Sequence, residues 1–285
     1  MLLQRVVTAL VLVALLLASL FTANPWAFAL LTLALMAAAG WEWGRLNQAG
    51  SGLAVAMGAA VAAGGGAALT AGWVERAPPL LWLLATLLWL VVGGVALRGG
   101  PSAWPRLPQA ARWIVGLLAL WAAWLAVVQA RDVSINFMLS VLCVVWMADV
   151  AAYFGGRALG KRKLAPSISP GKSWDGVWSG MLGVLLLSAL WMWIDGRFAV
   201  DGSSLFTRLA QSFGLAGMAL ALLALCGLSV TGDLVESLVK RAAGAKDSSR
   251  LLPGHGGVLD RVDALLPVLP AALALATPFT VGGAA

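Results

Sequence analysis

Nine apolar runs, separated by short polar connections, follow one another along the whole chain. Each approaches the roughly 20 residues that an α-helix needs to cross about 30 Å of hydrocarbon. They lie at residues 6–22, 25–40, 53–72, 80–97, 113–128, 134–153, 177–194, 213–230 and 264–281. The pattern predicts an all-α, polytopic integral membrane protein, a helical bundle with about nine transmembrane helices.

The overall composition supports a membrane location. The 285 residues are 61% hydrophobic and 11% charged, with a mean hydropathy of +0.91, which lies outside the range of soluble domains. The first apolar run follows Arg5 and could be taken for a signal peptide. It is long for such a segment, and no clean cleavage site precedes Pro25. We therefore expect this run to be retained as a span.

The basic residues of the connections indicate the orientation of the helices, because cytoplasmic connections are enriched in Lys and Arg. With a cytoplasmic N-terminus, fifteen of the nineteen basic residues fall on the cytoplasmic side and four on the other. This count predicts a multi-pass protein of the inner membrane with its C-terminus outside. Two charged connections, residues 155–176 and 231–263, then share the cytoplasmic face.

Candidate chemistry is concentrated in the second half of the chain. We divide the sequence into N-terminal transmembrane helices at residues 1–130 and a C-terminal catalytic region at residues 131–285. Glu42, which stands between two tryptophans, is interpreted as a charge at the membrane boundary. Cys143 and Cys226 lie within apolar runs and are interpreted as small buried residues. The net charge of +7 is not accompanied by aromatic residues interleaved with basic ones, so we expect no nucleic-acid partner.

The stretch at residues 229–263 holds five of the twelve acidic and five of the nineteen basic residues. A helix capped by Ser229 or Thr231 is predicted first, followed by a glycine-rich loop at residues 253–257 and a second helix start. The polar residues on one face of the first helix, or at the second helix start, are Asp233, Glu236, Lys240, Asp260 and Asp263. Carboxylates at both ends of a glycine-rich, lysine-bearing loop suit a divalent cation that bridges to phosphate oxygens.

The connection at residues 155–176 is a second candidate for phosphate binding. Its end resembles a P-loop, but that motif requires Gly where Pro166 stands, and no strand precedes it. What remains is a cluster of cations and hydroxyls on a loop shaped by Gly and Pro: Arg157, Lys161, Lys163, Lys172, Ser167, Ser169 and Ser173. Such groups hold phosphates, although a purely topological basic loop is equally compatible with composition. Asp149, a carboxylate inside an apolar run, is expected to face the bundle interior near the cytoplasmic end.

At these residues the chain resembles the phosphatidate cytidylyltransferases, or CDP-diacylglycerol synthases. The signature of that family reads S-x-x-K-R-x-x-x-x-K-D-x-x-x-x-x-P-G-H-G-G-x-x-D-R-x-D. It is met by Ser237, Lys240, Arg241, Lys246, Asp247, Pro253, Gly254, His255, Gly256, Gly257, Asp260, Arg261 and Asp263. A second recurrent stretch of the family resembles residues 153–176, which favours a functional role for that connection. The resemblance covers residues 149–263.

The resemblance implies that CTP and phosphatidic acid react to give CDP-diacylglycerol and pyrophosphate, with Mg²⁺ and possibly a monovalent cation. The residues expected to be catalytic are Asp233, Asp260, Lys240 and Lys246. Metal binding is assigned first to Asp233 and Asp260 and then to Asp263, Asp247 and Glu236. Substrate binding is assigned to Arg157, Lys161, Lys172, Ser173, Arg241, His255, Gly256, Gly257 and Arg261. The lipid would enter from the bilayer, and a homodimer is possible.

Two other classes of function compete with this interpretation. A CTP-dependent polyprenol or dolichol kinase would share the loop chemistry but would transfer the γ-phosphoryl group and release CDP. A transporter would also contain intramembrane charge and broken glycine-rich segments, but it should show an inverted repeat. The two charged connections of the second half have no counterparts before residue 130.

Overall fold

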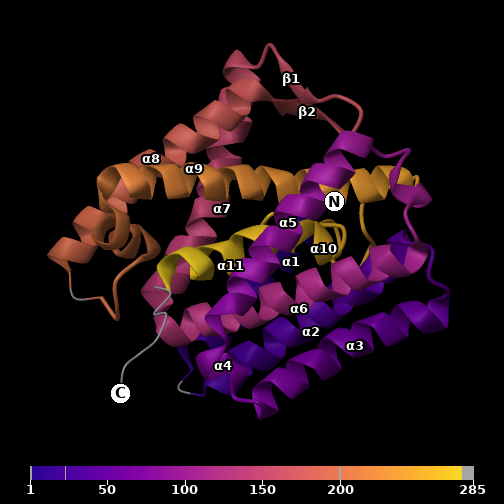
Figure 1. Cartoon of the computed structure of the whole chain (residues 1–285), viewed down its shortest axis with the longest axis horizontal. Coiled ribbons are helices and arrows are strands. Elements are labelled where there is room, and N and C mark those ends of the chain that lie inside the picture. The colour runs from indigo at the N-terminus through magenta and orange to yellow at the C-terminus, as the bar shows by residue number, and fades with distance from the viewer. Residues whose placement is uncertain (1, 23, 199, 278–285) are drawn as a thin grey trace.

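The computed structural model describes residues 2–22, 24–198 and 200–277 (Figure 1). The described chain is mostly helical. The helices are α1 (Leu2–Phe21), α2 (Pro25–Leu46), α3 (Ser51–Thr70), α4 (Trp73–Arg76), α5 (Pro79–Gly99), the 3₁₀ helix η1 (Trp104–Arg106), α6 (Gln109–Val133), α7 (Ile135–Leu159), α8 (Trp174–Arg197), α9 (Leu205–Ala242), α10 (Leu259–Val262) and α11 (Leu265–Ala276). In Figure 1, α9 runs across the molecule with α8 above it and α2, α3 and α6 below it, and α7 crosses it.

Within the described residues, seven helices are long and apolar enough to cross a membrane, namely α2, α3, α5, α6, α7, α8 and α9. This confirms the polytopic all-α prediction. The first predicted run corresponds to α1, whose apolar part, Val6–Phe21, is shorter. The last corresponds to α11, which has 12 residues, most of them buried, and residues 278–281 of that run lie outside the described chain.

The long helix α9 differs from the sequence prediction. We expected a span at residues 213–230 and then a separate helix capped by Ser229 or Thr231. Instead α9 covers 38 residues as two helical segments joined at a kink, where Gly214 has a non-helical backbone with φ +68°, and the second segment continues unbroken to Ala242. Thr231 lies in its interior and donates its hydroxyl hydrogen to the carbonyl of Gly227 at 2.8 Å. Its hydroxyl therefore has a partner within the helix, and the helix does not need to end there. At about 1.5 Å per residue, α9 is long enough to carry its C-terminal part beyond the hydrocarbon.

The connection at residues 155–176 is more ordered than a loop. Helix α7 continues to Leu159, so Arg157 belongs to its last turn. The chain then forms an antiparallel hairpin of β1 (Lys163–Ala165) and β2 (Ser169–Ser173). Ser173 ends the hairpin and caps α8 by accepting a hydrogen bond from the amide of Gly176 at 3.2 Å. The hairpin is a small addition to the predicted all-α architecture.

Glycines allow α7 and α8 to pack closely. A Cβ atom at Gly180 would lie 2.8 Å from the carbonyl oxygen of Ala148 on α7. That neighbour is backbone, which cannot move aside without shifting the helix. By contrast, a Cβ at Gly94 of α5 would meet open space.

We expect Gly180→Ala to destabilise the bundle by about 1–3 kcal/mol, the usual effect of overpacking. Thermal unfolding of the purified protein in detergent measures the effect. Gly94→Ala is the matched control and should melt at or above the wild-type temperature, because alanine is the better helix former. Equal melting of the two variants would contradict the close packing of α7 on α8.

Candidate active site

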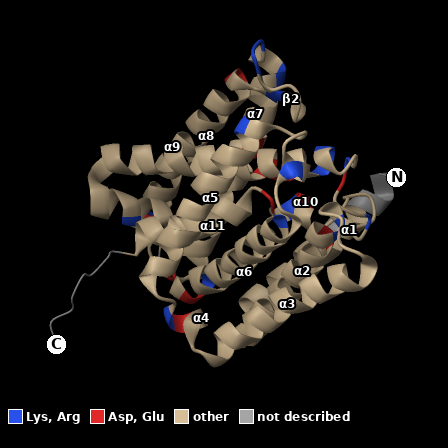
Figure 2. Cartoon of the chain, turned by 45° about the vertical axis from the view of Figure 1, so that its right-hand side comes forward, with Lys and Arg blue, Asp and Glu red and all other residues tan. Residues whose placement is uncertain are grey.

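Charged residues gather where the two charged connections meet (Figure 2). Lys172 at the end of the hairpin forms an ion pair with Asp233 of α9. Arg241, near the C-terminal end of α9, donates from Nε to the carbonyl of Ile168 at 3.4 Å. The prediction that the two connections share one face is therefore confirmed.

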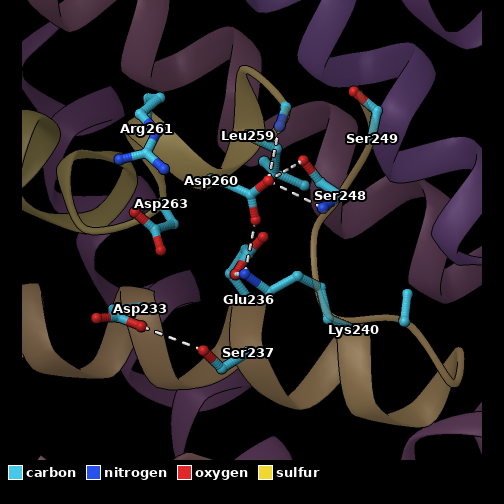
Figure 3. Close-up of polar contacts among 12 residues, drawn as sticks. Asp233, Glu236, Ser237, Lys240, Ser248, Ser249, Leu259, Asp260, Arg261 and Asp263 are labelled. Atoms are coloured by element: carbon cyan, nitrogen blue, oxygen red, sulfur yellow. Dashed lines mark hydrogen bonds and ion pairs between the residues drawn. The ribbon is translucent and has the colours of Figure 1, made fainter. Parts of the chain in front are cut away.

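A buried ion-pair cluster forms under the glycine-rich loop (Figure 3). The ammonium of Lys240 lies 2.5 Å from Oε2 of Glu236 and 2.6 Å from Oδ1 of Asp260. The three side chains are 11%, 3% and 7% exposed, respectively. The polar face predicted for this part of α9 thus exists, but it is covered by another segment of the chain. Lys240 pairs with two carboxylates, so its ammonium links Glu236 of α9 to Asp260 of α10.

Asp260 is the most heavily hydrogen-bonded carboxylate of the cluster. Its Oδ2 accepts hydrogen bonds from the amide and hydroxyl of Ser248, both at 2.9 Å, and from the amide of Gly257 at 2.8 Å. Burial by itself would raise the pKa of Asp260, but the hydrogen bonds from Lys240 and from these amides outweigh it and hold the pKa at about 2. Both carboxylate oxygens of Asp260 are therefore committed to protein donors.

Asp263 lies next to Asp233, between it and Arg261 in Figure 3. Burial raises the pKa of Asp263 to about 7, and the negative charge of Asp233 adds to the effect. Two neighbouring carboxylates that repel each other in this way fit a bound cation. Of the five acids predicted as metal ligands, these two lie next to each other. Asp233 also pairs with Lys172 and accepts from the hydroxyl of Ser237, while Oδ1 of Asp263 accepts from the amide of Ala264.

The complete metal-ligand set predicted from the sequence does not converge. Among the residues that the structure describes, no group of three or more His, Cys, Asp or Glu side chains is arranged to hold a metal ion. Asp260 turns to Lys240, and Asp247 lines a different cavity. The balance of charge still favours a cation, because two lysines face four carboxylates. These carboxylates belong to Asp233, Glu236, Asp260 and Asp263.

The glycine-rich loop is held in part by the side chain of Arg261. The carbonyl of His255 accepts two hydrogen bonds from Arg261, at 3.2 Å from Nε and 2.7 Å from Nη2. Gly256 has a φ of +83°, which favours glycine. Arg261 and His255 therefore shape the loop, and their predicted contacts with phosphate stay predictions.

A cavity of about 460 Å³ opens between α7, α8 and α9. Its polar lining includes Asp149, Arg157, Lys172, Ser173 and Asp233, and its apolar lining includes Val177, Met181, Cys226 and Val230. Asp149, predicted to face the bundle interior, lines this cavity but remains exposed. Lys161 is not part of this lining, and its amide donates to the carboxylate of Asp175 at 2.9 Å.

A second cavity, of about 660 Å³, lies beside the C-terminal ends of α2 and α9. Lys246, Asp247 and Arg250 line it together with Trp41 and Arg45. Lys246 and Asp247 were predicted to act beside Asp233, yet they lie on this separate cavity. Spacing in the sequence could not show that these residues line a different cavity from Asp233, because the chain between them folds back on itself.

Glu42 is a site residue that sequence reasoning missed. It was interpreted as a charge at the membrane boundary, and this was wrong, because its residue is 0% exposed. Its carboxylate accepts hydrogen bonds from the hydroxyl of Ser248 and from the amide of Leu259. The run predicted at residues 25–40 stopped two residues short of Glu42, whereas α2 continues to Leu46. With the full helix known, the rule that singled out Asp149, a carboxylate inside an apolar run, applies to Glu42 as well.

Comparison with known proteins shows which family the chain resembles along its length. The sequence profile described as "Cytidylyltransferase family" matches residues 3–279. A phosphatidate cytidylyltransferase of Pseudomonas aeruginosa is 38% identical over 286 residues, covering 96% of this chain and 97% of that protein. A phosphatidate cytidylyltransferase of Haemophilus influenzae is 45% identical over 133 residues, covering 47% and 43% of the two chains. One of Brucella melitensis is 48% identical over 126 residues, covering 44% and 41%.

Proposed function

The chain belongs to the cytidylyltransferase family, and from that premise we propose that it transfers CMP from CTP to phosphatidic acid. The products are CDP-diacylglycerol and pyrophosphate. The observation that carries the proposal is the cavity between α7, α8 and α9, which joins two cations and two carboxylates to an apolar wall. A soluble nucleotide and a membrane lipid can both reach such a place.

The cavity lining suits both the phosphate and the acyl chains of the lipid substrate. Arg157 and Lys172 supply positive charge for the phosphate of phosphatidic acid. Met181, Cys226 and Val230 supply an apolar surface for the beginning of the acyl chains. The acyl chains can then stay in the bilayer while the phosphate is held near Asp233.

The reaction needs positioning and charge neutralisation more than proton transfer. A phosphate oxygen of phosphatidic acid attacks the α-phosphorus of CTP, and the bond from that phosphorus to the bridging oxygen breaks, so pyrophosphate leaves with the electron pair. A phosphate monoester is already anionic near neutral pH, so it scarcely needs a general base. Lys172 and Arg157 of the cavity orient the phosphates and offset their charge.

We propose that Asp233 and Asp263 would hold Mg²⁺. The ion, when bound, supplies positive charge next to the phosphate oxygens. Asp260 would contribute indirectly, since its oxygens hold Lys240 and the loop.

Asp263→Asn is expected to weaken divalent-cation binding by at least about tenfold. Titration of the purified protein with Mn²⁺, followed by electron paramagnetic resonance, measures this without turnover. Asp132→Asn, on an exposed acid in the last turn of α6, is the control and should bind as the wild type does. Unchanged Mn²⁺ binding in Asp263→Asn would remove this residue from the metal site.

We also propose that this face of the molecule is cytoplasmic, in the inner membrane of a bacterium, with nine crossings and the N-terminus inside. The support is the distribution of basic residues, fifteen on this side against four. Contacts at the two ends of α1 agree with helices that alternate in direction across the membrane. Thr8 of α1 donates to the carbonyl of Pro253 at 3.1 Å, and Arg131 at the other end of α6 donates to the carbonyl of Leu20 at 3.1 Å.

Pyrophosphate release tests the function directly. The purified protein is given CTP and Mg²⁺ with phosphatidic acid, with diacylglycerol or with no lipid. We expect pyrophosphate and CDP-diacylglycerol with phosphatidic acid alone. Release of CDP without pyrophosphate would indicate a CTP-dependent kinase, and absence of turnover with every lipid would contradict an enzyme of this class.

A further inference from the structure

Glu42 makes four hydrogen bonds to a segment more than two hundred residues away. Its Oε1 accepts from the hydroxyl of Ser249 at 2.5 Å and from the amide of Val258 at 3.0 Å. Its Oε2 accepts from the hydroxyl of Ser248 at 3.2 Å and from the amide of Leu259 at 2.7 Å. No Lys or Arg among the described residues forms an ion pair with it. A buried carboxylate that is neutralised only by such donors is held where the donors converge.

We propose that Glu42 is a positioning residue for CMP transfer, which fixes the glycine-rich loop over the reaction centre. Its donors come from both ends of the loop: Ser248 and Ser249 precede it, and Val258 and Leu259 follow it. A single carboxylate on α2 therefore closes the loop at its base. α2 belongs to the half of the chain that carries no family motif.

Glu42 and Asp260 divide the donors of the loop between them. Asp260 takes the amides of Ser248 and Gly257, and Glu42 takes those of Val258 and Leu259. The hydroxyl of Ser248 lies within hydrogen-bonding distance of both carboxylates. A change at Glu42 is thus transmitted through the loop to Asp260 and its partner Lys240.

The negative charge of Glu42 matters as much as its size. Glutamine has the same shape but replaces one acceptor oxygen with an NH₂ group, which would face N–H or O–H donors whichever way the amide is turned. Aspartate keeps both acceptors and the charge but is one methylene shorter. If Glu42 only filled space, glutamine would be the better replacement, whereas our proposal favours aspartate.

The test compares Glu42→Gln, Glu42→Asp and Ser249→Ala with the control Glu75→Gln, an exposed acid on α4. We expect kcat of Glu42→Gln to fall by about a hundredfold per folded enzyme, because small misplacements of reacting groups cost that much. Glu42→Asp should retain more activity than Glu42→Gln, and Ser249→Ala should show a smaller loss. Glu75→Gln should behave as the wild type.

Hydrogen exchange at the amides of Val258 and Leu259 is read on the same proteins without turnover. We expect faster exchange in Glu42→Gln but not in Glu75→Gln. If Glu42→Gln fails to fold, the exchange rates of Ser249→Ala are used instead. Wild-type exchange in both Glu42→Gln and Ser249→Ala, or full activity in Glu42→Gln, overturns the proposal. The kcat comparison rests on the proposed function. If the wild-type protein released no pyrophosphate, that function would be refuted. The exchange data would still decide whether Glu42 holds the loop.

Discussion

Asp260→Asn is expected to reduce pyrophosphate release by about a thousandfold or more, because it disturbs two sets of buried contacts at once. The carboxylate holds Lys240 with one oxygen and the loop amides of Ser248 and Gly257 with the other. An asparagine has one acceptor oxygen and must turn its NH₂ group toward either the ammonium or the amides. Either orientation leaves a buried donor facing another donor.

Measurement of kcat and KM with phosphatidic acid separates this effect from a loss of lipid binding. The lipid cavity is lined by α7, α8, α9 and β2, not by Asp260, so we expect kcat to fall while the KM for phosphatidic acid changes little. Asp132→Asn, at the opposite end of the molecule from the loop, is the matched control. Near-wild-type turnover in Asp260→Asn would mean that the Lys240 cluster does not organise the reaction centre.

The sequence was sufficient to locate the charged cluster, because its residues are polar in an apolar chain. Asp233, Glu236 and Lys240 follow helical spacing, so their common face could be predicted from the sequence. The cost of intramembrane charge likewise pointed to Asp149, which lines the cavity. Local periodicity and composition thus predicted most helices and the meeting of the two charged connections.

The partners of each charge could not be predicted in the same way, because they depend on tertiary packing. The pairing of Lys240 with Asp260 requires the loop to fold back over α9, and no local pattern specifies that return. Continuation of α9 through Thr231 was missed because a hydroxyl that can cap a helix can also bond within one. The contacts of Glu42 span 206 to 217 positions in sequence, which spacing arguments do not reach.

Gly257→Ala tests how tightly the loop is closed. Gly257 is buried, and a Cβ atom there would lie well inside contact distance of both the Ser248 hydroxyl and the Glu42 carboxylate. These two groups hold the loop, so neither can move without losing its own hydrogen bonds. We expect pyrophosphate release to fall by more than about a hundredfold and stability to fall by about 1–3 kcal/mol.

Gly227→Ala on α9 is the control, because a Cβ there meets open space and alanine favours the helix. It should keep its activity and melt no lower than the wild type. Activity of Gly257→Ala close to that of the control would show that the loop can open without cost. Catalysis would then not depend on the shared donors of Glu42 and Asp260. A large loss of activity with normal melting would place the effect in the loop itself, since the rest of the bundle would have folded undisturbed.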